Sequence, residues 1–293
     1  METNAIQRQL SGHNGAIYDA CWDQYRGEWL TAGGDGVVAA WAKTDREHGR
    51  AVFQSRQAFF SIAPLKSGPV AGTESGELMM LDAERKPRKI VAHDKGVFSI
   101  TPIDGSRFFC GGGDGRITGW NALTQIGDWH WKRASKIRVI SPSSAGTFIG
   151  SSSGDGIIVP ELSPGIDLEK AITIVGHKGG VYAALFLVDK NVWLTGGRDG
   201  HLRVWSKHGE SLLSIPAHEA AIYRIVQRKG VIYTASRDKS VKSWNENDLS
   251  FRAKWDRSNR GAKRSVNALC IGGEKPTWLM AAGDDRVIRM VQL

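Results

Sequence analysis

The chain has 293 residues, a formal net charge of +9 and a pI near 9.5. Its 35 Gly, 11 Trp and 9 Pro fit many short strands joined by tight turns, and no segment keeps the apolar period of a long helix. No run of about 18 apolar residues occurs, and the first residues form neither a basic leader nor an apolar stretch. The composition therefore excludes a helical membrane protein, and export by such a leader is not expected.

The cysteines indicate a reducing compartment. Cys21, Cys110 and Cys270 are odd in number, and each lies in a strand-like segment. A free Cys there behaves as a small core residue. We expect a cytoplasmic protein, although a nuclear one would have the same cysteine pattern.

In chain order, strand-like segments recur and end at a Trp or at a residue standing in for it. The ends are Trp41, Leu81, Trp120, Glu161, Trp205, Trp244 and Met290, with spacings of 40, 39, 41, 44, 39 and 46 residues. In most units an Asp lies six residues before the end, beside a small turn. Four units open with a His at His13, His93, His177 and His218, 20 to 22 residues before that Asp. Such a repeat is typical of a propeller blade.

Over its whole length the sequence resembles the WD40 family. The resemblance implies an all-β fold: a seven-bladed WD40 β-propeller of four-stranded antiparallel blades, forming one domain over residues 1–293. The fifth unit shows all four strands, at 181–188, 192–197, 201–205 and 211–218. The chain ends on a third strand, so residues 4–10 are expected to complete the last blade and close the ring.

The resemblance also implies a buried hydrogen-bonded tetrad of His, hydroxyl, Asp and Trp in several blades. The three sets are His13, Thr31, Asp35 and Trp41; His177, Thr195, Asp199 and Trp205; and His218, Thr234, Asp238 and Trp244. Blade three has Cys110 in place of the hydroxyl. Blades two, four and seven lack the His, and we expect these three to be the softer blades.

A His beside an Asp and a hydroxyl is also the composition of a hydrolase triad, or of part of a metal site. The same trio recurs in several blades, which argues against one catalytic centre. The four opening His are 80, 84 and 41 residues apart and fall in separate blades, too far apart to share one ion. We expect no enzyme activity, no cofactor and no metal.

The position five residues after each opening His is rich in aromatic residues. In WD40 folds this position starts the innermost strand and faces the channel mouth on the top face. Alignment of all seven blades gives Tyr18, Phe60, Phe98, Arg138, Tyr182, Tyr223 and Asn267. The rings either plug the mouth or form a rosette that binds a protein or peptide and stacks on its cations.

A second top-face position precedes the turn Asp. Its expected occupants are Gly34, Glu74, Gly113, Gly154, Arg198, Arg237 and Gly283. We expect Arg138, Arg198 and Arg237 to read charge on an acidic segment of a partner. The sequence thus favours a monomeric, non-catalytic interaction scaffold with binding residues Tyr18, Phe60, Phe98, Arg138, Tyr182, Tyr223, Arg198 and Arg237.

The distribution of charge keeps a nucleic-acid-binding alternative open. Residues 201–293 carry 17 basic and 9 acidic residues, whereas residues 1–200 carry 22 and 21. Six of the 17 lie in residues 252–264, and Trp129 and Trp131 lie in a further basic segment. Lys and Arg would neutralise phosphates, and the aromatic rings would stack on bases.

Overall fold

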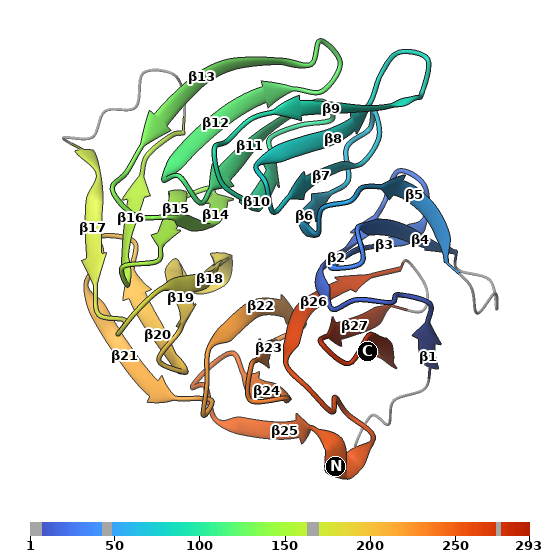
Figure 1. Ribbon diagram of the computed structural model, residues 1–293. Coiled ribbons are helices and arrows are strands. Elements are labelled where there is room, and N and C mark those ends of the chain that lie inside the picture. Colours follow the sequence, from blue (N-terminus) through green and yellow to red (C-terminus); the bar gives the residue numbers. More distant parts are fainter. Residues whose placement is uncertain (1–7, 43–48, 163–169, 274–276) are drawn as a thin grey trace. The chain divides into compact units, whose positions relative to one another are not determined.

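The computed structural model describes residues 8–42, 49–162, 170–273 and 277–293 (Figure 1). The chain divides into two compact units, which we call unit 1 (residues 1–64 and 223–293) and unit 2 (residues 65–222). The strands in these described ranges form seven four-stranded sheets, in the orders β2-β3-β4-β5, β6-β7-β8-β9, β10-β11-β12-β13, β14-β15-β16-β17, β18-β19-β20-β21, β22-β23-β24-β25 and β1-β28-β27-β26. We number them blades one to seven.

The strands are short, as the sequence predicts. The first blades contain β2 (Ile17–Asp23), β3 (Glu28–Gly33), β4 (Val37–Ala42), β5 (Arg50–Gln54), β6 (Phe59–Ala63), β7 (Val70–Thr73), β8 (Glu77–Leu81), β9 (Pro87–Val91), β10 (Val97–Pro102), β11 (Arg107–Gly112), β12 (Arg116–Asn121) and β13 (Ile126–Lys132). Blades four and five contain β14 (Ile137–Ser143), β15 (Gly146–Ser151), β16 (Asp155–Val159), β17 (Ile172–Val175), β18 (Val181–Leu187), β19 (Val192–Gly197), β20 (His201–Ser206) and β21 (Ser211–Pro216).

The remaining strands are β22 (Ile222–Arg228), β23 (Val231–Ser236), β24 (Val241–Asn245), β25 (Phe251–Trp255), β26 (Val266–Gly272), β27 (Trp278–Gly283), β28 (Val287–Gln292) and β1 (Arg8–Ser11). Two short 3-10 helices, η2 (Val188–Lys190) and η3 (Arg257–Asn259), are described beside them. No helix in the described ranges is long and apolar enough to cross a membrane.

The two ends of the chain share one sheet, which confirms the expected closure. β1 pairs antiparallel with β28, from Arg8 opposite Met290 to Ser11 opposite Val287. Leu10 of β1 is buried in a cluster with Ile17, Met280 and Ile288. Residues 4–7 of the predicted closing segment lie outside the described residues. The pairing covers an edge of β28 that would otherwise expose its hydrogen-bonding groups.

Apolar side chains join neighbouring sheets within each unit. In unit 2, Ile117 of β12 packs with Ile137 and Ile149 of blade four, and Phe148 of blade four packs with Trp193 of blade five. The ring centroids of Phe148 and Trp193 are 5.5 Å apart. These contacts follow from the period-two alternation of the strands, which turns one apolar side chain in two toward each neighbouring sheet.

Strand register moves two of the predicted repeat ends. In blade one Trp41 lies opposite Trp29, the second residue of β3. The residues in this place are Val159 in blade four and Val291 in blade seven, opposite Thr147 and Leu279. Glu161 lies beyond the end of β16, and Met290 lies one residue before Val291, the residue that occupies this place in blade seven. Neither blade has a Trp to mark the end, so the sequence alone misplaced it.

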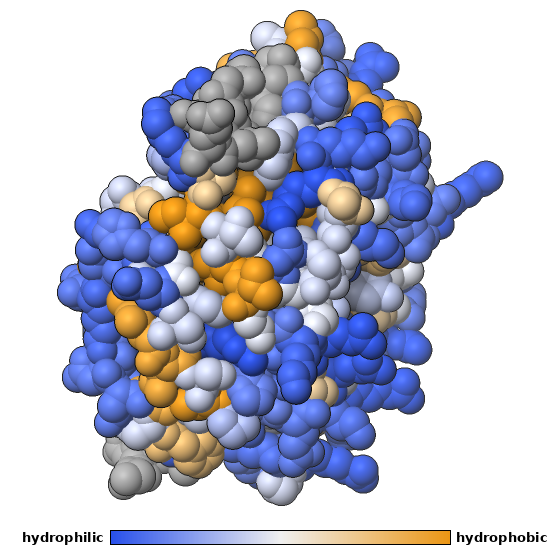
Figure 2. All heavy atoms as spheres, turned by 90° about the vertical axis from the view of Figure 1, so that its left-hand side faces the viewer, coloured by the Kyte–Doolittle hydropathy of each residue, from blue (hydrophilic) through white to orange (hydrophobic). Residues whose placement is uncertain are grey.

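Apolar residues also gather on the outermost strands of unit 2. Figure 2 views the side that carries β17 and β21, where orange spheres stand out from a mostly polar surface. The exposed apolar residues of these strands are Val175, Leu212 and Leu213. They belong to the fourth strands of their sheets, whereas the residues singled out for binding belong to the first.

Candidate functional site

Each first strand carries one of the predicted binding residues at its second position. These residues are Tyr18 in β2, Phe60 in β6, Phe98 in β10, Arg138 in β14, Tyr182 in β18, Tyr223 in β22 and Asn267 in β26, and all are half-buried. The sequence alignment of the seven blades therefore agrees with the strand positions, including in blades two, four and seven, which lack the opening His.

A β-bulge determines how these side chains point. In blades one, three, four, five and seven the register between first and second strand shifts across this position, which is held by Tyr18, Phe98, Arg138, Tyr182 and Asn267. A bulge adds one residue to a strand, bends it and re-aims the side chain. The second position thus escapes the alternation that would bury it between sheets.

In unit 2, three of these residues form a stack, which we call the arginine stack: Phe98, Arg138 and Tyr182. The guanidinium carbon of Arg138 lies 4.2 Å from the centroid of the Phe98 ring and 4.6 Å from that of Tyr182. Both distances are within the range of a cation–π interaction. These two rings hold the chain's own Arg138 between them, and the expectation that the aromatic residues stack on cations of a partner stays a prediction.

The glycines beside the stack leave room for its rings. A Cβ on Gly113 would lie 3.0 Å from a ring carbon of Phe98, and one on Gly180 would overlap the Tyr182 ring. In blade five Arg198 takes the place of Gly113, and its side chain packs over Gly179. Arg198 is exposed, and its backbone N–H donates to the Gly180 carbonyl at 2.8 Å.

In unit 1 the second-position rings contact each other. Tyr18 and Phe60 meet edge to face, with centroids 5.2 Å apart. A Cβ on Gly34 would lie 3.1 Å from a ring carbon of Tyr18, the same relation as between Gly113 and Phe98. Edge-to-face pairs of this kind are favourable because the positive ring edge meets the negative ring face.

Next to this pair is an ion pair that no sequence pattern predicts. Arg224 donates to a carboxylate oxygen of Asp19 at 2.8 Å, and the other oxygen of Asp19 accepts from the Ile62 backbone N–H at 3.0 Å. Asp19 and Arg224 directly follow Tyr18 and Tyr223 in sequence and lie 205 residues apart. A pair so distant in sequence leaves no spacing signal, so only the folded unit reveals it.

The position before the turn needs two corrections. In blade seven Asp285 takes the role of Asp35, since its carboxylate accepts from the backbone N–H groups of Lys263 and Val287. The residue before the turn is therefore Asp284, not Gly283. Asp284 accepts from the side chain of Asn267 at 2.7 Å.

In blade four Gly154 has the positive φ that Gly36 has in blade one, so Ser153 is the turn residue and Ser152 precedes it, not Gly154. Asp155 begins β16 instead. Its carboxylate accepts from the hydroxyls of Ser151 and Ser153 and pairs with Arg133. Arg237, at the corresponding place in blade six, is exposed.

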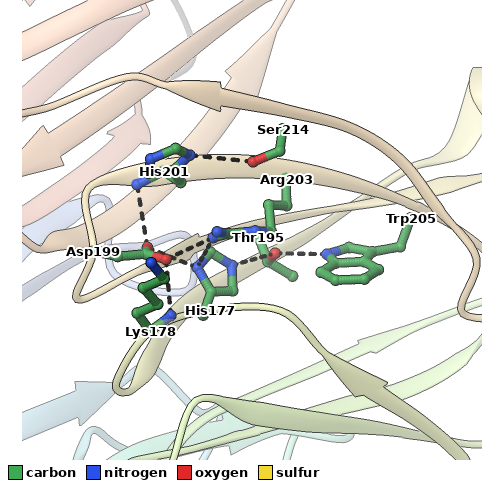
Figure 3. A network of polar contacts seen from close by, with 8 residues as sticks. All are labelled: His177, Lys178, Thr195, Asp199, His201, Arg203, Trp205 and Ser214. Carbon is green, nitrogen blue, oxygen red and sulfur yellow. Dashed lines mark hydrogen bonds and ion pairs between the residues drawn. The ribbon is translucent and has the colours of Figure 1, made fainter.

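The tetrads are built as the resemblance implies, most fully in blade five (Figure 3). His177 bonds through Nδ1 to Asp199 at 2.9 Å and through Nε2 to Thr195 at 2.9 Å. The indole N–H of Trp205 donates to Thr195 Oγ1 at 2.8 Å. Arg203, which the sequence did not single out, adds an ion pair of 2.8 Å with Asp199.

The same connection is present in blade one. His13 bonds to Asp35 at 2.9 Å and to Thr31 at 2.7 Å, and Trp41 donates to Thr31 at 2.8 Å. In blade six Trp244 donates to Thr234 at 3.0 Å, and Asp238 accepts from the Ser240 hydroxyl at 2.6 Å. In these blades the network ties the turn and the second strand to the third.

Burial sets the protonation of the blade-five tetrad. Burial lowers the pKa of His177 to about 4, despite the opposing effect of the Asp199 carboxylate. Burial has the opposite effect on Asp199 and raises its pKa. Hydrogen bonds from His177 and the Lys178 backbone outweigh this effect and lower the pKa of Asp199 to about 2. At neutral pH the imidazole is neutral and the carboxylate charged. Both groups are hydrogen-bonded within the blade, which is the arrangement of a structural network.

Blade three completes its tetrad by another route. Thr118 of β12 lies opposite Cys110 of β11 in the ladder. Its hydroxyl bonds to His93 Nε2 at 3.1 Å and accepts from Trp120 Nε1 at 2.7 Å, and His93 bonds to Asp114 at 3.0 Å. The hydroxyl has moved from the second strand to the third, while the network it joins is unchanged.

Blade seven has lost its tetrad. Ala281 lies where Thr31 lies in blade one, opposite Arg289, and Val291 takes the place of Trp41. Arg289 reaches into the vacated space and pairs with Asp285 at 2.8 Å, both side chains being almost fully buried. A small apolar cavity remains beside it, lined by Ala262, Ala281 and Val291 among others.

No cluster of potential metal ligands occurs among the residues that the structure describes. The basic segment 252–264 spans β25, η3 and the loop that leads to β26. Within it Lys254 pairs with Asp256 at 2.8 Å, while Arg257, Arg260, Lys263 and Arg264 are exposed. Trp131, another residue predicted to stack on bases, packs against the core between blades three and four, and so behaves as an ordinary strand residue.

Comparison with known proteins identifies the repeat. A model described as "WD domain, G-beta repeat" matches residues 4–41 and 169–206. The U5 small nuclear ribonucleoprotein 40 kDa protein of Dictyostelium discoideum is 28% identical over 121 residues, which cover 40% of this chain and 33% of that protein. A ribosome biogenesis protein WDR12 homolog of Aedes aegypti is 31% identical over 100 residues, covering 32% and 23%. The chain thus aligns with about a third or less of each relative.

The fold match extends over nearly the whole chain. The crystal structure of the WD40 β-propeller domain of Doa1 has a TM-score of 0.81 with this protein and 17% sequence identity, and the match covers 98% of this chain and 95% of that one. WD40 propellers generally serve as non-catalytic scaffolds that mediate protein–protein interactions. Two of the seven repeats match the WD40 model, and the chain as a whole has the fold of a seven-bladed WD40 β-propeller.

Proposed function

We propose that the protein is a non-catalytic interaction scaffold that binds a protein segment through the second-position side chains of its first strands. The observation that carries this proposal is the arginine stack. Arg138 is half-buried, and two rings lie against its guanidinium. An arginine held in this way loses little side-chain entropy on binding, and its planar donors suit a carboxylate.

The partner segment we expect is therefore acidic. A carboxylate that reaches Arg138 would gain charge-assisted hydrogen bonds, and the partly exposed edges of Phe98 and Tyr182 would supply rigid apolar contact area. Arg198 is exposed, and its side chain packs against Gly179 while the Tyr182 ring packs against Gly180. It would add a second cation. In unit 1, Tyr18, Phe60, Tyr223 and exposed Arg237 have the same side-chain chemistry. We place the protein in the cytoplasm, acting as a monomer.

The test is affinity capture from a lysate of the native host, with and without nuclease, followed by mass spectrometry. Arg138→Met keeps the length and apolar contacts of the side chain and removes its charge and donors. We expect a protein captured by the wild type after nuclease treatment to be lost from Arg138→Met. The matched control is Phe251→Ala, which removes an exposed ring of β25 outside the stack.

Equal loss from both variants would contradict a specific role of the stack. Capture that disappears with nuclease and survives Arg138→Met would contradict the proposal and assign the interaction to nucleic acid. The melting temperature of each variant shows that the protein is still folded.

A further inference from the structure

Blade seven carries a hollow that none of the second-position residues lines. Its volume is about 440 Å³, and its walls include Arg257, Arg260 and Lys263 from the segment after β25, Gln9 from β1, and the Asp285–Arg289 pair. A volume of several hundred cubic ångströms is typical of a ligand-binding pocket. All of these residues belong to unit 1.

Two residues that line the hollow, Asp285 and Arg289, neutralise each other's charge. Arg289 makes two hydrogen-bonded contacts of 2.8 and 3.0 Å with the Asp285 carboxylate, and its Nε donates to the Arg260 carbonyl at 3.3 Å. The second oxygen of Asp285 also accepts from the Lys263 backbone N–H at 2.8 Å. The Asp285 carboxylate is therefore balanced by Arg289 and does not neutralise the other cations of the lining.

The walls carry a surplus of positive charge. Arg257, Arg260 and Lys263 are exposed, and none of their side chains forms an ion pair with an acidic residue in the described part of the chain. The structural roles of Arg260 and Lys263 are carried by their backbone carbonyl and N–H. Their side chains are thus available for an anion, and a concave site concentrates the field of the three cations.

The loop beside the hollow lacks the His of an intact tetrad. Ala262 stands where His13 stands in blade one, one residue before the backbone N–H that donates to the turn carboxylate. Arg289 pairs with Asp285 as Arg203 pairs with Asp199 in blade five. Where the tetrad is intact, as in blade five, the carboxylate of the turn bonds to the His of the preceding loop. In blade seven that loop instead bears cations.

The neighbouring strand favours a peptide over a nucleic acid. Gln9 lies in β1, which is the edge strand of its sheet, so its outward backbone groups can pair with an extended chain. The apolar cavity next to the hollow has a volume of about 20 Å³, which is too small to admit a nucleobase. Backbone pairing and carboxylates together suit an acidic peptide.

We propose that this hollow binds an acidic, extended peptide segment, with its carboxylates on Arg257, Arg260 and Lys263 and its backbone along β1. The proposal does not depend on the arginine stack, which lies in unit 2. It adds, on a different blade, a second site that binds acidic groups.

The experiment measures fluorescence anisotropy of a labelled eight-residue peptide with alternating Glu and Val. The variant combines Arg257→Gln, Arg260→Gln and Lys263→Gln, which keeps the backbone contacts. We expect affinity to fall about tenfold or more, because three charge contacts of ordinary strength are lost. The matched control combines Arg85→Gln, Lys86→Gln and Lys132→Gln, three exposed cations of unit 2, and removes the same net charge.

Three results would overturn the proposal. The first is no binding of the peptide to the wild type, and the second is an equal loss in the control, which would show an effect of net charge alone. The third is that a labelled eight-nucleotide oligouridine binds and loses affinity in the variant while the peptide does not bind, which would assign the hollow to nucleic acid. Retention of peptide binding by Arg138→Met separates this site from the proposed function.

Discussion

At the scale of single residues, the fold tolerates a hydroxyl that changes strand. In blade one the tetrad hydroxyl belongs to Thr31, opposite Ala39 in the ladder, and in blade three it belongs to Thr118, opposite Cys110. Residues directly opposite each other on adjacent strands point to the same face, so either can present a hydroxyl at the same point. What the network requires is an oxygen between His and Trp, whichever strand supplies it.

This equivalence can be tested by exchanging the two residues. Thr118→Ala leaves His93 and the Trp120 indole without their shared partner, and we expect a loss of about 1–3 kcal/mol in the free energy of unfolding. Adding Cys110→Thr recreates the Thr–Ala pair of blade one and should recover most of that loss. Urea denaturation measures both. A double variant no more stable than Thr118→Ala would contradict the equivalence.

At the scale of the blade, the tetrads make stability depend on pH. His177 is neutral in the folded protein because burial lowers its pKa from the ordinary 6.5 to about 4. The unfolded chain takes up a proton as the pH falls below 6.5, whereas the folded chain does not until about 4. The contribution of this group is therefore fully present above pH 6.5 and is lost between pH 6.5 and 4. The lowered pKa of His93, also caused by burial, acts in the same direction.

We expect the free energy of unfolding to decrease by roughly 3 kcal/mol between pH 6.5 and 4 on account of His177, since each pKa unit corresponds to about 1.4 kcal/mol. Equilibrium unfolding in urea at several pH values measures it. His177→Gln should flatten the curve in this range, while His208→Gln, at an exposed position, should leave it unchanged. Parallel curves for the wild type and His177→Gln would contradict this assignment.

At the scale of the whole molecule, pairing of the first strand with the last strand is expected to make the repeats unfold cooperatively. Leu10 is buried against residues of blades one and seven, and β1 forms backbone bonds along β28. Without β1 the last sheet would have three strands, with β28 as its edge, and a gap in its core. The array would then resemble an open solenoid, whose repeats unfold more independently.

Deletion of residues 1–10 should therefore abolish cooperative unfolding. Scanning calorimetry measures the width of the transition, which we expect to broaden or to split. Deletion of residues 1–7 keeps all of β1 and is the matched control. A chain lacking residues 1–10 that melts like the parent would contradict the role of this pairing.

The architecture of this protein could be predicted from its amino-acid sequence. The spacing of Trp41, Trp120 and Trp205, with their turn Asp and opening His, is local information that recurs once more in blade six. For the same reason the second-position residues, from Tyr18 to Asn267, could be aligned before the structure was known. Where the repeat had lost its markers, in blades four and seven, the predicted ends at Glu161 and Met290 were displaced from Val159 and Val291.

The contacts that these residues make could not be predicted and are seen only in the folded protein. Arg138 lies over Phe98 and Tyr182 because three bulges, about 40 residues apart along the chain, turn their side chains toward one another. The pairing of Asp19 with Arg224 and the unpaired cations of the blade-seven hollow likewise depend on segments distant in sequence. Periodicity determines which face of a strand is buried, whereas contacts between side chains of different blades depend on how neighbouring blades bring their bulged positions and loops together.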